Sequence, residues 1–180
     1  MRRVKSASAV FLPAVLLGAC VGGGGSVRTA SVPSSVVTVA PVMTMSAAAY
    51  VAAASSIDLF AIRSAQLALQ RAQSPASRAF AERTLRAHQG TSAQLSFAGR
   101  RLNLLPVASL NPQQQSMLDA LQSTPDFDST YRAQQAMILS EGVALHGNYA
   151  TAGDSPTLRP IARNAESVMR ANLTALRRSR

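Results

Sequence analysis

The chain has 180 residues, of which 47% are hydrophobic and 14% are charged, so it has the composition of a globular protein rather than of a disordered one. A single cysteine and two histidines exclude a disulfide framework and a thiolate metal cluster. No apolar run reaches about 18 residues, which excludes a multi-pass membrane protein. Eighteen basic residues against eight acidic ones give a net charge of +10.

The N-terminus has the features of a bacterial lipoprotein signal. Arg2, Arg3 and Lys5 precede a short apolar run from Ala7 to Ala19. The run ends in the sequence Leu-Gly-Ala-Cys, which resembles a lipobox, the motif in which the cysteine thiol is acylated and the chain is cut before it. We therefore predict a signal peptide over residues 1–19 and lipid attachment at Cys20. The alternative is an ordinary secretory signal with an unrelated cysteine.

This signal predicts a place in the cell envelope of a Gram-negative bacterium. Val21 follows the cysteine at the position where lipoproteins retained in the inner membrane usually have aspartate. By resemblance to such lipoproteins, the sequence favours anchoring in the outer membrane, with the protein on the periplasmic side. A strongly basic chain often binds nucleic acid, but in this compartment we expect no nucleic-acid partner.

Residues 20–45 are rich in Gly, Ser, Val, Thr and Pro and lack helical periodicity. This composition predicts a flexible, lipid-anchored tether, which as a coil would span about 25–30 Å. The predicted helical domain comprises residues 46–180.

Within the domain, apolar residues recur at steps of three and four, the pattern of amphipathic helices. Ser46 is a suitable N-cap, and Ser74-Pro75 and Asn111-Pro112 each combine a capping side chain with proline at the first helical position. Further long helices are expected from Phe127 and after Gly153, although Pro160 leaves the start of the last one open. Four long helices in two hairpins, joined by a loop with a short helix, predict an all-α four-helix bundle. The alternative is a three-helix array with one mobile arm.

Several short motifs carry a family resemblance. They are Leu67-Ala68-Leu69 leading into Ser74-Pro75, Phe80-Ala81 with His88, Leu104-Leu105-Pro106, Phe127-Asp128-Ser129-Thr130-Tyr131, Val143-Ala144-Leu145 and Gly153-Asp154. With these motifs the chain resembles the domain-of-unknown-function 4142 family of exported bacterial proteins, from Tyr50 to about Leu176. The resemblance implies a ferritin-like four-helix bundle, and it implies no established reaction.

The family pattern places an acid–histidine pair on the second helix, another on the third long helix and a Glu-His pair on the last. This chain keeps His88, with Ala87 in place of the acid. Leu139 and Asn172 stand at the other two histidine positions. The resemblance therefore implies that this chain lacks most of any metal or polar site of its relatives.

The candidate polar or ligand site consists of Asp58, His88 and Glu141, which could meet across helices. A carboxylate-bridged di-metal bundle needs Glu-x-x-His on one helical face, and the sequence has no such motif. We therefore predict no metal and no cofactor, and we interpret His88 as hydrogen-bonded to a neighbouring helix. His146 is expected to face solvent. Phe127, Asp128 and Tyr131 are interpreted as structural, because aspartate suits the first turn of a helix and tyrosine buries its ring.

No arrangement of nucleophile and base is recognisable in the sequence. We therefore predict a lipid-anchored bundle with a binding or structural role and no enzymatic activity. The alternative, which depends on the fold resemblance alone, is a ferritin-like metal-binding or redox protein. The C-terminal Arg177, Arg178 and Arg180 are either solvated or a contact for anionic lipid or an envelope partner.

Overall fold

The computed structural model describes residues 44–106 and 108–179. The predicted signal peptide, Cys20 and nearly all of the predicted tether lie outside these residues. The described part contains five helices and no strand, which confirms the all-α prediction. The helices are α1 (Ala47–Arg71), α2 (Pro75–Arg101), α3 (Pro112–Ser123), α4 (Phe127–Ala152) and α5 (Leu158–Arg178).

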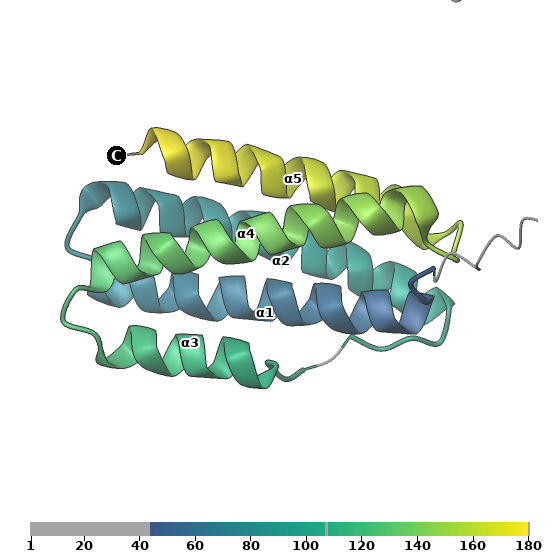
Figure 1. The fold of residues 1–180 in the computed structure, drawn as a ribbon, viewed down its shortest axis with the longest axis horizontal. Helices are drawn as coiled ribbons and strands as arrows, with labels where there is room; N and C mark the ends of the chain where they lie inside the picture. Colours follow the sequence, from purple (N-terminus) through teal and green to yellow (C-terminus); the bar gives the residue numbers. More distant parts are fainter. Residues whose placement is uncertain (1–43, 107, 180) are drawn as a thin grey trace, which may run out of the picture. The chain divides into compact units, whose positions relative to one another are not determined.

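The four long helices form a bundle of two antiparallel hairpins, α1 with α2 and α4 with α5 (Figure 1). The connection from α2 to α4 travels the length of the bundle, so α2 and α4 run in the same direction (Figure 1). One long crossover between two hairpins is the topology of ferritin-like bundles. The short helix α3 lies within this crossover and packs against α1 and α4.

The helix starts follow the capping signals of the sequence. Ser46 Oγ accepts a hydrogen bond from the Ala49 amide at 3.2 Å, and Ser74 Oγ accepts one from the Ala76 amide at 3.2 Å. Asn111 and Gln114 form a reciprocal capping box at the start of α3. Pro160 is the third residue of α5, where its missing amide proton breaks no helical hydrogen bond.

The apolar core has two parts at different levels of the bundle. The phenylalanine-rich core fills the end where α1 and α3 finish and α4 starts. Its largest buried members are Phe60, Phe80, Leu121, Phe127 and Tyr131. The tether-end core fills the opposite end, where the described chain begins, and contains Tyr50, Val51, Leu95, Tyr149 and Leu158.

The Phe127–Tyr131 motif lies in the phenylalanine-rich core. The Tyr131 ring is fully buried, and its centroid is 6.1 Å from that of Phe127 and 6.3 Å from that of Phe80. Asp128 connects this end of α4 to the turn between α1 and α2, because its carboxylate accepts the backbone amides of Gln73 at 2.9 Å and Ser74 at 3.3 Å. Partial burial raises the pKa of Asp128, but the Ser77 side chain, the two backbone amides and the nearby Arg78 together hold the pKa below its usual range.

Arg71 secures the crossover at the same end of the bundle. Its guanidinium donates to the backbone carbonyls of Leu121, Gln122 and Thr124. These carbonyls lie at the C-terminal end of α3, where no further helical turn supplies amides to pair with them. The same guanidinium lies 5.0 Å from the centroid of the Phe127 ring, a cation–π contact. One side chain therefore joins the end of α1 to the end of α3 and the start of α4.

The helix pair α4–α5 approaches closely at a glycine. A Cβ atom added at Gly142 would lie 3.3 Å from Met169 Cγ, so the absence of a side chain lets α5 pack closely. None of the described helices has an apolar stretch long enough to cross a membrane.

Candidate functional site

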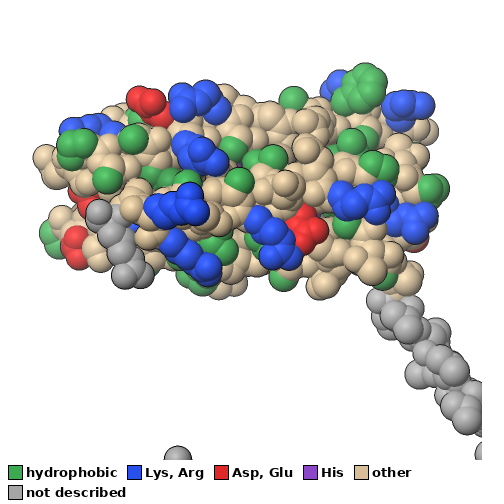
Figure 2. Space-filling model, turned by 90° about the horizontal axis from the view of Figure 1, so that it is seen from above, with side chains coloured by type: hydrophobic (Ala, Val, Ile, Leu, Met, Phe, Trp, Pro, Cys, Tyr) green, Lys and Arg blue, Asp and Glu red, His purple; other side chains and the backbone are tan. Residues whose placement is uncertain are grey.

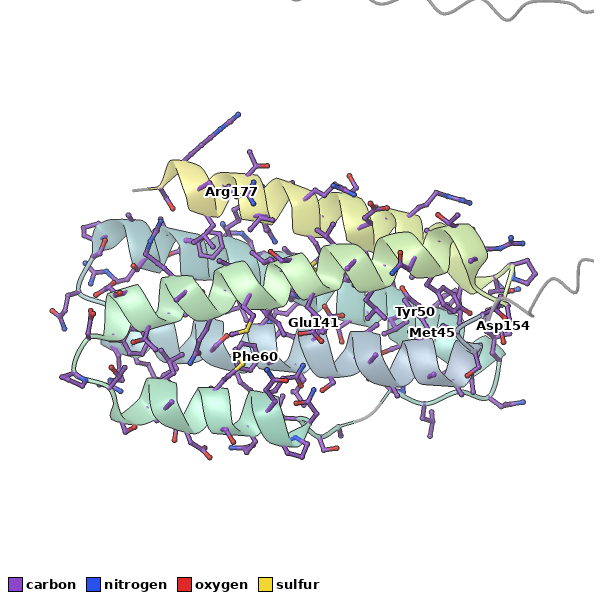
Figure 3. The ribbon with its side chains drawn as sticks, viewed as in Figure 1. Met45, Tyr50, Phe60, Glu141, Asp154 and Arg177 are labelled. Carbon is purple, nitrogen blue, oxygen red and sulfur yellow. The ribbon has the colours of Figure 1, made fainter. Side chains whose placement is uncertain are left out.

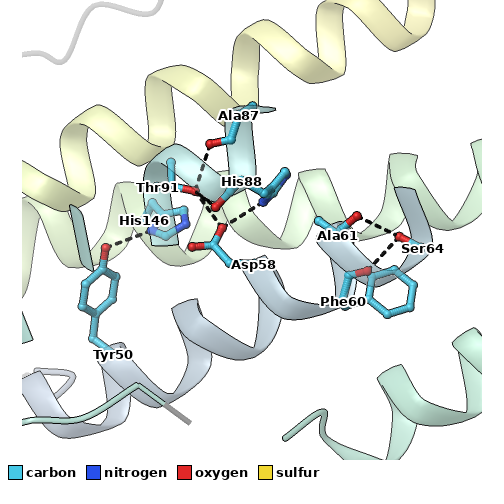
Figure 4. A network of polar contacts seen from close by, with 9 residues as sticks. All are labelled: Tyr50, Asp58, Phe60, Ala61, Ser64, Ala87, His88, Thr91 and His146. Atoms are coloured by element: carbon cyan, nitrogen blue, oxygen red, sulfur yellow. Dashed lines mark hydrogen bonds and ion pairs between the residues drawn. The ribbon is translucent and has the colours of Figure 1, made fainter. Parts of the chain in front are cut away.

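A cluster of buried polar side chains lies inside the bundle, next to the tether-end core (Figure 4). We call it the polar cluster, and its members come from three helices. They are Tyr50 and Asp58 of α1, His88 and Thr91 of α2, and His146 of α4. None of them is more than 5% exposed. Polar groups at this depth must find hydrogen-bond partners within the protein, because unpaired ones are costly.

Asp58 and His88 form the most tightly paired part of the polar cluster. His88 Nδ1 lies 2.8 Å from Asp58 Oδ1, and Thr91 Oγ1 donates to the same oxygen at 2.8 Å (Figure 4). Because an ionised carboxylate only accepts hydrogen bonds, Nδ1 of His88 carries a proton. The other ring nitrogen, Nε2, is buried and has no hydrogen-bond partner.

Tyr50 and His146 form the second pair. The Tyr50 hydroxyl lies 3.0 Å from His146 Nδ1, and the two rings meet edge to face with centroids 5.7 Å apart. Burial raises the pKa of Tyr50, so the hydroxyl keeps its proton. Burial also lowers the pKa of His146 to about 4, although the carboxylate of Asp58 acts in the opposite direction. His146 is therefore neutral at pH 7, and its Nε2 is also buried without a partner.

Glu141 does not join this cluster. Its side chain is exposed and lines a hollow of about 320 Å³ between α1, α3 and α4, with Ser56 and Gln114 among its neighbours. In Figure 3, Glu141 lies midway along the bundle. Of the three predicted site residues, the structure thus brings together Asp58 and His88 and places Glu141 at the surface.

A second hollow, of about 270 Å³, lies between α2 and α5 and is lined by Ala87, Thr91 and Asn172 among others. Arg83 Nε donates to Asn172 Oδ1 at 2.8 Å beside it. Asn172 is one of the positions at which the family pattern has histidine, and the other, Leu139, is fully buried among apolar side chains. A guanidinium at this place disfavours the binding of a cation there.

Among the described residues, no group of three or more His, Cys, Asp or Glu side chains is arranged to hold a metal ion. The two histidines of the polar cluster provide two nitrogen donors, His88 Nε2 and His146 Nε2, and Asp58 already accepts from His88 and Thr91. The polar cluster therefore offers an incomplete set of ligands.

The prediction that His146 faces solvent is wrong, since the residue is 2% exposed. A solvent-facing His146 would require α4 to bury one face only. In the structure α4 packs against α1, α3 and α5, so it buries more than one face. The spacing from Gly142 through His146 to Ala150, in steps of four, is the signal that identifies the second buried face.

These features define a class: a helical bundle of ferritin-like topology with an occluded Asp–His and Tyr–His cluster in its core. The model of the family described as "Domain of unknown function (DUF4142)" matches residues 32–178. The chain belongs to this family. The match begins earlier than the predicted resemblance, which started at Tyr50.

Comparison with solved structures shows the same fold at low sequence identity. CopM in its Cu(II)-bound form has a TM-score of 0.65 and 18% identity, over 76% of this chain and 96% of that one. A DUF305 fragment from Deinococcus radiodurans has a TM-score of 0.64 and 15% identity, over 73% of this chain and 92% of that one. CopM in an Ag-bound form has a TM-score of 0.62 and 16% identity, over 75% and 95%. A search of curated proteins gave no match.

Proposed function

We propose that this protein is a lipid-anchored helical bundle of the Gram-negative cell envelope, with a binding or structural role and no enzymatic activity. The observation that carries the proposal is the single cysteine at position 20, which follows a basic and apolar leader and precedes a closed bundle. The family match supports the bundle part of the proposal. The domain would lie on the periplasmic side, anchored in the outer membrane.

The burial of the polar cluster supports a role without catalysis. Asp58 and His88 have the chemistry of an acid–base pair, but their side chains are 2% and 0% exposed. A general base must come within hydrogen-bonding distance of the proton that it removes. A substrate would have to displace packed side chains to reach this pair. The surface of the bundle is therefore the part available to partners.

The anchor is tested by the intact mass of the protein exported from a Gram-negative host. We expect a mature chain that begins at Cys20 and carries the added mass of acyl chains, and we expect no acylation in the Cys20→Ala variant. Cleavage at another position, or an unmodified thiol at Cys20, would overturn the anchor. A Val21→Asp variant tests the choice of membrane: acylation should be unchanged, while the protein should move from the outer-membrane to the inner-membrane fraction.

A second candidate function, binding of a transition-metal ion in the core, is favoured by one specific observation. Two imidazole Nε2 atoms are buried without partners, and one of these rings is oriented by a carboxylate on its other nitrogen. A histidine oriented by a carboxylate in this way is typical of metal ligands, and imidazole suits copper, zinc and nickel. The fold likeness to the Cu(II)-bound and Ag-bound forms of CopM supports the same candidate. The incomplete set of ligands is the argument against it.

The two candidates are distinguished by the metal content of the full chain, purified without a metal-chelating tag. Metal binding predicts a stoichiometric ion that is lost in both His88→Ala and His146→Ala and is kept in Glu141→Gln, whose side chain is at the surface. A folded, metal-free chain that takes up no copper or zinc would exclude this candidate. Circular dichroism of each variant shows whether the bundle has remained folded.

A further inference from the structure

One end of the bundle exposes large apolar side chains. Five such side chains are exposed among the described residues, and three of them belong to the end where the described chain begins. They are Met45 at 40%, Phe97 at 61% and Leu105 at 76% exposure. Single exposed apolar residues are ordinary, but several at one end indicate a binding surface.

Arginines surround these apolar side chains. Phe97, Arg100 and Arg101 have the spacing i, i+3 and i+4 in the last turns of α2, so they share one exposed face of that helix. Arg159 and Arg163 come from the start of α5, which lies beside these turns, since Asn164 Nδ2 of α5 donates to Gln94 Oε1 of α2 at 2.8 Å. Figure 2 shows basic and hydrophobic side chains side by side at the right-hand end of the face that it displays.

We call this surface the basic apolar end, and its residues are Met45, Phe97, Arg100, Arg101, Leu105, Arg159 and Arg163. Asp154, in the turn between α4 and α5, is an acidic residue at this end of the bundle, and its carboxylate accepts a hydrogen bond from the Tyr149 hydroxyl at 2.9 Å. The basic apolar end therefore has an excess of positive charge, which complements an anionic partner.

The described chain enters the bundle at this same end. It begins at Thr44, and the residues that separate it from Cys20 are 21–43. The tether predicted from the composition of these residues would span about 26 Å, whereas the 27 residues of α2 make the bundle about 40 Å long. A membrane that holds Cys20 is therefore closer to the basic apolar end than to the other end of the bundle.

The C-terminal arginines lie at the far end. Figure 3 shows Met45 and Arg177 at opposite ends of the bundle. At the far end Arg177 and Arg178 are joined by Arg71 and Arg132, and the carboxylates of Asp126 and Asp128 lie where α4 begins. The two ends therefore differ mainly in their exposed apolar side chains. Leu69, in the last turn of α1, is only 36% exposed. The C-terminus, which the sequence suggested as a lipid contact, is thus a poorer match for an anionic bilayer than the basic apolar end.

We propose that the basic apolar end docks on an anionic phospholipid surface, which holds the bundle upright on the membrane that carries its anchor. Phe97 and Leu105 would enter the headgroup region, and the guanidinium groups would pair with lipid phosphates. Arginine pairs with phosphate through parallel hydrogen bonds, and apolar contacts combined with basic charge are the usual basis of interfacial binding. This inference rests on the proposed lipid anchor, because the anchor decides which end faces the membrane.

The test uses the mature chain, residues 20–180, with Cys20→Ala so that no acyl chain contributes to binding. Its co-sedimentation is measured with vesicles of phosphatidylcholine alone and with vesicles that also contain phosphatidylglycerol. We expect binding only to the anionic vesicles, weakened by added salt. The double variant Arg100→Gln/Arg101→Gln should reduce the partition coefficient about tenfold or more. Phe97→Ser/Leu105→Ser should also reduce it.

Two matched control variants test whether vesicle binding depends on the basic apolar end or on similar side chains elsewhere on the bundle. Arg177→Gln/Arg178→Gln removes the same charge at the far end, and Met137→Ser removes an apolar side chain that is 47% exposed midway along α4. Neither control should change the partition by more than about twofold. The proposal is overturned if anionic vesicles are not bound, or if the Arg177/Arg178 variant loses as much binding as the Arg100/Arg101 variant. It is also overturned if sedimentation shows a dimer in solution that Phe97→Ser dissociates, since a second copy would then cover this surface.

The failure of the docking surface and the failure of the proposed anchor give different results. If the exported protein is acylated at Cys20 while the unacylated chain ignores anionic vesicles, the anchor stands and the docking surface fails. If Cys20 is not acylated, the anchor fails whatever the vesicles show.

Discussion

The phenylalanine-rich core and the polar cluster occupy neighbouring levels of the same bundle, yet they depend on different interactions. The first packs aromatic and aliphatic side chains, and its stability comes from apolar area removed from water. The second encloses two histidines, a carboxylate and two hydroxyls that must satisfy one another. Burial of an apolar side chain stabilises the folded protein, whereas burial of a polar side chain destabilises it unless the side chain is hydrogen-bonded. The two regions are equally buried, so their contributions to stability differ through the chemistry of their side chains.

The largest effect is expected from the phenylalanine-rich core. Phe60→Ala should lower the free energy of unfolding by about 4 kcal/mol, because the side chain is fully buried and its removal leaves a cavity. Urea denaturation measures this loss. The matched control is Phe97→Ala, which removes the same ring from an exposed site and should change stability by about 0.5 kcal/mol or less. Equal losses in the two variants would contradict the assignment of Phe60 to the core.

In the polar cluster, removing one partner of the Asp58–His88 pair should lower the free energy of unfolding nearly as much as Phe60→Ala does. Replacing both partners by apolar side chains should lower it less. Asp58→Ala leaves His88 buried without its partner and should lower stability by about 3 kcal/mol. The double variant Asp58→Leu/His88→Leu replaces both groups by apolar ones and should recover most of this loss. Urea denaturation of the two variants makes the comparison. A double variant less stable than Asp58→Ala would show that the pair contributes more than mutual compensation.

The polar cluster should respond to mild acid through His146. The pKa of His146 is about 4 in the folded protein and about 6.5 when the chain is unfolded, so the unfolded state binds the proton first. The stability associated with His146 is therefore fully present above pH 6.5 and is lost as the pH falls toward 4. Between pH 7 and pH 5 the loss should be about 2 kcal/mol. Chemical denaturation of wild type and His146→Gln over this range measures it, and parallel pH profiles would show that another group is responsible.

The smallest effect is expected outside both regions. Gly90 lies on the exposed face of α2, one residue from Thr91, and a Cβ atom added there meets nothing within 4 Å. Gly90→Ala should raise stability by about 0.5–1 kcal/mol through helix propensity alone. Gly99 provides the contrast, because a Cβ atom there would lie 2.4 Å from the Leu104 carbonyl oxygen, so Gly99→Ala should be destabilising. Thermal unfolding of the two variants tests both signs.

The helices could be predicted from the sequence because their boundaries have local causes. A capping side chain followed by proline identifies the starts at Ser74 and Asn111 without any knowledge of neighbours. Amphipathic stripes then indicate which face of each helix is buried, and four such helices can form few architectures. For this reason the all-α bundle followed from the sequence.

The site could be predicted only in part, because its composition depends on contacts between helices. Asp58 and His88 were candidates by residue type, but their pairing depends on the relative register of α1 and α2, which a sequence without coordinates does not define. His146 was assigned to the wrong face because α4 buries more than one face. Glu141 could meet Asp58 and His88 across helices by sequence alone, but it lies at the surface because the α4 face toward the cluster is occupied by Gly142 and His146.

The hydrogen bonds between Arg71 and the end of α3 bear on whether two copies of this chain can exchange hairpins at high concentration. The two hairpins are joined only by residues 102–126, which include α3, and each hairpin completes its packing against the other. Loss of the Arg71 hydrogen bonds would release the segment that connects the two hairpins. The α4–α5 hairpin of one molecule could then pack on the α1–α2 hairpin of another, as in domain swapping. The hydrogen bonds of Arg71 to the end of α3 oppose such an exchange, because they hold the connecting segment against its own α1.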